Sequence, residues 1–150
     1  MAGLEYYEDA TAAALMTKVS KTNPLPTAPA IAPTGTTQFI AGSGNVANAA
    51  AVATVGSGAN FAYLTGFDLT GGGATAAGII QVTVSGLAVS GGTLVWTVMV
   101  PAGATGGITP LMPRFNPPLK SAAATNIIVT AAAFGVGNTN ATLNVYGFSA

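Results

Sequence analysis

Short runs of β-prone residues separated by turn residues dominate the chain from residue 37 onward. In the clearest run, Gly78–Leu87, the apolar residues Ile80, Val82 and Val84 alternate with polar ones, which is typical of a strand with one buried face. Gly, Ser and Asn fill the gaps between runs, as turns require. The runs expected to form strands are Thr37–Ala41, Ala50–Val55, Phe61–Thr70, Gly78–Leu87, Thr93–Val100, Asn126–Phe134 and Ala141–Phe148.

Alternation also predicts which side chains face inward. The turn Ser90–Gly92 indicates a hairpin between Gly78–Leu87 and Thr93–Val100, in which Leu94, Trp96 and Val98 point into the core. The run Phe61–Thr70 divides into two faces. One face is expected to hold Phe61, Tyr63, Thr65, Phe67 and Leu69, and the other Ala62, Leu64, Gly66 and Asp68.

The segment Ile108–Leu119 combines four prolines with a single arginine. Proline fixes φ and lacks a donor, so the segment is not expected to be a helix or a central strand, yet it is too apolar for a free loop. We interpret it as a packed crossing between two strands, near another subunit. Arg114 would bridge subunits or cap exposed carbonyls there. The candidate interface residues are Leu111, Met112, Arg114, Phe115 and Leu119.

These patterns predict an all-β fold, an antiparallel β-sandwich of jelly-roll-like type, over residues 37–150. An immunoglobulin-like sandwich is the alternative. Residues 1–36 are expected to form an extended N-terminal arm: Glu8–Met16 as a short helix or a frayed terminus, then the proline-rich Asn23–Pro33 as a docking segment or a semi-rigid linker. The candidate docking residues are Leu4, Tyr6, Tyr7, Leu15, Pro24, Leu25 and Pro26.

Charge is scarce: Asp, Glu, Lys and Arg make up 5% of the chain, against about 25% in ordinary globular proteins. A protomer with so few charged side chains should associate readily with other surfaces. We therefore expect much of its surface to be buried in an oligomer or against a larger body. The net charge of zero argues against nucleic acid as a partner. The apolar runs are too short to span a membrane, and the acidic N-terminus is unlike a secretory signal, so we expect assembly in a cytoplasm.

The sequence offers little chemistry. With no His and no Cys, the common general bases, nucleophile pairs and transition-metal sites are missing, and we expect no enzyme, cofactor or metal. Asp68 is the one carboxylate of the expected β body. It could face solvent, pair with Arg114 or Lys120, or ligate calcium.

Several segments resemble small tailed-bacteriophage virion proteins. They are Ala62–Thr75, Val100–Thr105, Arg114–Leu119, Ala133–Asn140 and Tyr146–Gly147, together with Asn23–Pro26. The resemblance implies a non-enzymatic decoration (cement) protein with a jelly-roll body, often trimeric, on an icosahedral head. Its partners would then be its own copies, in a homotrimer, and the major capsid protein, which the arm would grip. The alternatives are a head-fibre or tail-tip module that binds host glycans, or a neck or tail-completion protein.

Overall fold

The structure of the chain is a computed structural model that describes residues 37–89 and 92–150, and every regular element in these ranges is a β-strand. The expected arm, residues 1–36, lies outside the described residues. Among the described ones, no helix is long and apolar enough to cross a membrane. The strands are β1 (Thr37–Gly42), β2 (Ala51–Val55), β3 (Ala62–Gly72), β4 (Gly78–Ser85), β5 (Thr93–Val100), β6 (Arg114–Lys120), β7 (Ile127–Ala131) and β8 (Asn140–Ser149).

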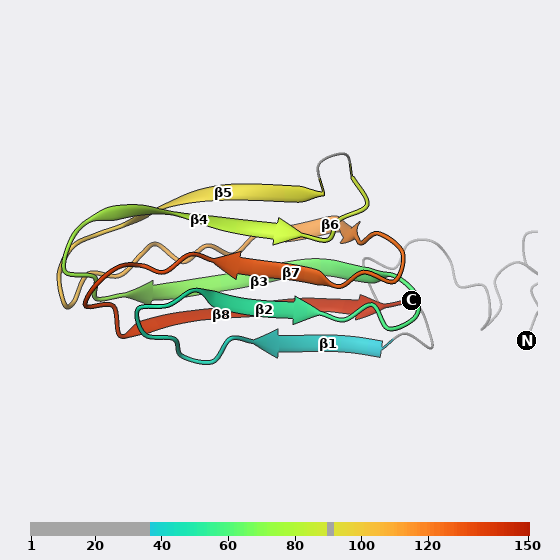
Figure 1. Ribbon diagram of the computed structural model, residues 1–150, viewed down its shortest axis with the longest axis horizontal. Helices are drawn as coiled ribbons and strands as arrows, with labels where there is room; N and C mark the ends of the chain where they lie inside the picture. The colour runs from blue at the N-terminus through green and yellow to red at the C-terminus, as the bar shows by residue number, and fades with distance from the viewer. Residues whose placement is uncertain (1–36, 90–91) are drawn as a thin grey trace, which may run out of the picture. The chain divides into compact units, whose positions relative to one another are not determined.

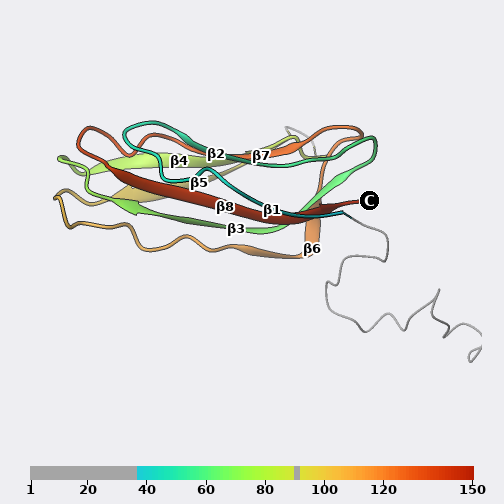
Figure 2. The same cartoon turned by 90° about the horizontal axis from the view of Figure 1, so that it is seen from below.

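The strands, labelled in Figure 1, form two antiparallel sheets, in the orders β1-β8-β3-β6 and β2-β7-β4-β5. Figure 2 shows the two sheets as separate layers. The pairs β1–β8, β2–β7, β3–β6 and β4–β5 are those of one long hairpin folded at its middle. Rolling that hairpin adds the pairs β8–β3 and β7–β4. This order is that of a jelly roll, so the expected sandwich is confirmed and the immunoglobulin-like order is not found.

The core lies between the inner faces of the two sheets. In β4 the predicted alternation is confirmed, since Ile80, Val82 and Val84 are buried, and the β4–β5 hairpin forms as expected. On β5, Trp96 and Val98 pack against the core, whereas Leu94 is exposed. The largest fully buried apolar side chains are Phe67, Leu64, Leu69, Ile127, Leu143, Val55, Val82, Val84, Val100, Val129 and Val145.

A β-bulge in β3 overturns the predicted faces of Phe61–Thr70. The partners of Leu64 and Gly66 on β8 are the consecutive residues Gly147 and Tyr146, so Thr65 is an extra residue in the ladder. Its hydroxyl donates a hydrogen bond to the Tyr146 carbonyl at 3.0 Å. One additional residue exchanges the faces of the strand. Ala62 and Leu64 therefore point inward on one side of the bulge, and Phe67 and Leu69 on the other.

The proline-rich segment is an irregular edge strand rather than a crossing. Residues from Gly107 to Lys120 follow the free edge of β3: Gly107 pairs with Gly72, Leu111 with Leu69, and β6 continues the pairing with Arg114 opposite Gly66. Sequence reasoning was right to exclude a central strand. An edge strand tolerates proline because only one side of its backbone needs partners.

Gly66 lets β6 approach β3 closely, which gives a test of this edge. A Cβ atom at Gly66 would lie 2.7 Å from the Pro113 carbonyl oxygen and 2.8 Å from Arg114 Cδ. We expect Gly66→Ala to lower the free energy of unfolding by about 1–3 kcal/mol, measured by urea denaturation. Gly78→Ala is the control, because nothing lies within 4 Å of its Cβ position. Equal stabilities of the two variants would contradict the close approach.

Candidate functional site

Three polar side chains form one cluster on the outer face of sheet β1-β8-β3-β6. Arg114 Nη2 lies 2.7 Å from Asp68 Oδ1 as an ion pair, and the Tyr146 hydroxyl donates a hydrogen bond to Asp68 Oδ2 at 2.6 Å. The guanidinium also lies over the Tyr146 ring, 5.0 Å from its centroid. Through Nη1 it donates to the carbonyls of Phe67, at 3.0 Å, and Pro113, at 3.1 Å. We call Asp68, Arg114 and Tyr146 the Arg114 cluster.

This geometry decides between the roles that the sequence left open for Asp68, since its carboxylate pairs with Arg114. Burial raises the pKa of Asp68, but the hydrogen bond from Tyr146 and the Arg114 guanidinium outweigh it, so the pKa lies below its usual value. The hydrogen bond to Asp68, followed by burial, raises the pKa of Tyr146. At neutral pH the cluster therefore holds a charged carboxylate and a neutral phenol.

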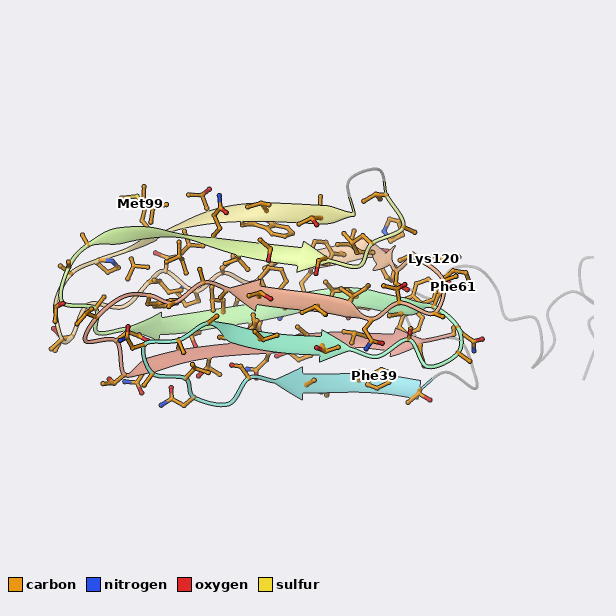
Figure 3. All side chains as sticks on the ribbon, in the orientation of Figure 1. Phe39, Phe61, Met99 and Lys120 are labelled. Atoms are coloured by element: carbon orange, nitrogen blue, oxygen red, sulfur yellow. The ribbon has the colours of Figure 1, made fainter. Side chains whose placement is uncertain are left out.

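A second cluster lies at one end of the same sheet. Lys120 Nζ lies 3.7 Å from the ring centroid of Phe61 and 5.9 Å from that of Tyr63, and Figure 3 shows Phe61 and Lys120 together at this end. Tyr63 in turn stacks on Phe148, with centroids 4.8 Å apart and planes at 10°. Cation–π contacts of this kind hold the ammonium without a carboxylate.

The outer face of the other sheet carries no charge, and we call it the uncharged face. Register places its side chains in rows, for example Val52, Thr130, Thr83 and Val95 across the four strands. The uncharged face was not predicted from the sequence, although apolar residues occupy several of the outward-facing positions of the alternating strands. The face consists of Val52, Thr54, Ile79, Gln81, Thr83, Ser85, Thr93, Val95, Thr97, Met99, Ile128 and Thr130. Figure 3 labels Met99 on it.

The predicted interface residues separate into two groups. Leu111, Phe115 and Leu119 are partly buried against the protomer's own core. Phe115 contacts Phe67 and Trp96, with centroids 6.4 and 6.2 Å apart. Met112, with 53% of its surface exposed, points outward. The interface role of these residues stays a prediction. All seven candidate docking residues of the arm lie outside the described residues.

The chemistry of the described residues is limited. Nowhere in 37–89 or 92–150 do three His, Cys, Asp or Glu side chains gather as a metal site requires. Asp68 is the one side-chain carboxylate of these ranges. Arg114 contacts one of its oxygens and Tyr146 the other. What the arrangement offers is therefore two surfaces, one polar and aromatic, the other uncharged.

The lowered pKa of Asp68 predicts a pH-dependent contribution to stability. A depressed folded-state pKa stabilises the fold above the unfolded value of 3.8 and ceases to do so as the pH falls through the folded value. We expect Asp68→Asn to lower the free energy of unfolding by about 1 kcal/mol at pH 7. In urea denaturation this difference from wild type should shrink below the unfolded pKa of 3.8. A difference that does not change with pH would contradict the ion pair.

Comparison with known proteins gives little further guidance. No family model matches the chain, and no curated protein matches it. Among solved structures, the chain is similar to one from the virus-like particle of the extra small virus of the giant freshwater prawn Macrobrachium rosenbergii, solved by cryo-EM. The two are 12% identical, with a TM-score of 0.33, and the match covers 84% of this chain and 86% of the other.

Proposed function

We propose that the chain is a non-enzymatic structural protein of a tailed-phage particle, and that it decorates the capsid. The observation that carries the proposal is the uncharged face. Twelve outward side chains on four strands include no charged residue, and five of them are apolar. Depletion of charge marks the buried centre of protein interfaces. The phage-like segments of the sequence support the same role.

The proposed partners are other copies of the chain, in a homotrimer, and the major capsid protein. A decoration protein binds many identical sites and stabilises the shell by mass action, and a multivalent oligomer gains avidity from simultaneous contacts. The uncharged face would be buried against the shell. The arm of residues 1–36 would add contacts to the capsid protein. The protein would be assembled in the host cytoplasm and reside in the virion.

The aromatic residues on the described surface do not favour the alternative of a glycan-binding module. A sugar needs an accessible ring face on which to stack. Lys120 lies over Phe61, Arg114 lies over Tyr146, and Tyr63 is stacked on Phe148. Trp96, which is partly buried against the core, contacts Phe67 edge-on with ring centroids 5.4 Å apart. Each of these rings already has a partner in the protomer.

Placing one charge on the uncharged face tests the proposal. Val95, 51% exposed at the middle of β5, would become Lys, and Val136, 72% exposed in a loop, would become Lys as the control. Particles carrying each variant are purified by sedimentation, and the copies per particle are counted by quantitative mass spectrometry. We expect wild type and Val136→Lys at hundreds of copies and Val95→Lys to be lost from particles. A wild-type count of only a few copies would indicate a tail or neck protein instead.

The predicted subunit interface has its own test at Met112. Because this side chain is exposed, Met112→Lys should leave the free energy of unfolding nearly unchanged and yet dissociate the oligomer in light scattering. Leu119→Ala is the contrasting variant, since Leu119 packs on the protomer's own core and its truncation should lower stability. An intact oligomer in Met112→Lys would remove Met112 from the interface.

A further inference from the structure

The charged side chains of the chain fall into two groups, one in the body and one in the first 36 residues, where Lys18 and Lys21 follow Glu5, Glu8 and Asp9. The described residues hold Arg114, Lys120 and Asp68, so two cations and one carboxylate leave the body with one net positive charge. The remaining carboxylates all fall within the first nine residues, where there is no cationic side chain. We call residues 4–9 the acidic segment. Its sequence is Leu4-Glu5-Tyr6-Tyr7-Glu8-Asp9.

The positive charge of the body sits on an exposed surface that has apolar and aromatic neighbours. Asp68 neutralises Arg114, whereas Lys120 pairs with no carboxylate among the described residues and rests on the Phe61 ring. An aromatic face attracts an ammonium but accepts no conventional hydrogen bond from it, so the donors of Lys120 are available. We call this surface the Lys120 patch. It consists of Ile40, Phe61, Tyr63, Arg114, Lys120 and Tyr146.

Ile40 shows that the patch is not covered by the rest of the described body. It stands opposite Tyr146 in the β1–β8 register, on the outer side of the sheet, and 81% of its surface is exposed. This exposed aliphatic residue beside Tyr146, on the face that also carries Tyr63 and the two cations, complements an acidic segment that contains Leu4, Tyr6 and Tyr7. The patch and the acidic segment therefore match in both charge and apolar character.

The first 36 residues join the body beside this patch. β1 begins at Thr37, which is paired with Ser149, and Ser149 is paired on its other side with Ala62, the neighbour of Phe61. Phe61 and Lys120 lie at this same end of the sheet in Figure 3. The segment that precedes β1 thus joins the sheet at the same end as Phe61 and Lys120, across the width of the sheet from β6.

The length of sequence before β1 allows the acidic segment to reach a second copy. Three strand spacings separate β1 from β6, which is about 14 Å. The sequence of Asn23–Pro33 favours an extended polyproline-type chain of about 34 Å, at about 3.1 Å per residue. An extended spacer of this length would be more than twice the distance across the sheet, which is enough for the acidic segment to reach the patch of a neighbouring copy.

We propose that the acidic segment of one copy binds the Lys120 patch of a neighbouring copy. Its carboxylates would pair with Lys120, while Leu4, Tyr6 and Tyr7 would cover Ile40 and the aromatic rings. Such a contact is heterologous and can close into a ring of copies. It assigns the start of the arm to a second copy and leaves Leu15 and Pro24–Pro26 for the capsid protein. The inference does not depend on the decoration role.

Zero-length crosslinking of the full-length protein tests the proposal. Equal amounts of unlabelled and ¹⁵N-labelled protein are unfolded, mixed and refolded, and a carbodiimide then couples adjacent carboxylates and amines as amides. We expect mass spectrometry to find Lys120 linked to Glu5, Glu8 or Asp9, with one peptide labelled and the other unlabelled. Links within one isotope only would place the acidic segment on its own body. Absence of any link from Lys120 to residues 5–9 would also overturn the proposal.

Charge exchange supplies the matched controls. Lys120→Arg keeps the charge but cannot form the amide, so the link should vanish while the oligomer persists. Lys120→Glu should raise the dissociation constant of the oligomer about fivefold, as loss of an exposed ion pair predicts. Adding Glu5→Lys, Glu8→Lys and Asp9→Lys to that variant should restore the affinity, and a lack of rescue would count against the pairing. The decoration role is tested by a different experiment, the particle binding of Val136→Lys and Val95→Lys. Either the decoration role or the contact between copies can therefore fail while the other holds.

Discussion

The bulge at Thr65 is the constraint on which the rest of the body depends. Without an extra residue, β3 could not direct both Leu64 and Phe67 into the core, because the side chains of a strand alternate. Phe67 must point inward to meet Trp96, 5.4 Å away across the sandwich, and Phe115 on the edge strand. These rings link both sheets and the edge strand β6, and aromatic packing of this kind stabilises beyond the area it buries.

The same shift places Asp68 outward, where Arg114 and Tyr146 reach it. Gly66 then leaves room for the backbone of the proline-rich strand, and Arg114 closes the contact by donating to the Phe67 carbonyl. Natural sheets protect their edges with prolines and charges, and here one edge has both. The packing of the core and the polar cluster outside it are therefore consequences of one local irregularity.

The sequence predicted most of the fold because alternation is a strong signal where strands are regular. β4 shows this, with Ile80, Val82 and Val84 buried as expected. The bulge could not be predicted, since Thr65 and Gly66 fit a regular strand equally well until the partner strand is known. The edge strand β6 was not predicted because its prolines were taken to indicate a crossing between two strands. Proline prevents hydrogen bonding only through its own backbone nitrogen, so it is compatible with an edge strand that pairs on one side. Of the site, the Asp68–Arg114 pair was one of several alternatives, whereas Tyr146 and the uncharged face required knowledge of which strands pair.

The two outer faces differ in what they can contribute to binding. Burial of the uncharged face would supply affinity at about 25 cal/mol per Å² of apolar area, with little specificity because hydroxyl and aliphatic groups fit many surfaces. Charge supplies orientation and discrimination more than affinity. Because Asp68 already neutralises Arg114, Lys120 holds the unneutralised charge of the described body. On the described body, Lys120 is therefore the side chain through which charge could orient a partner that presents carboxylates.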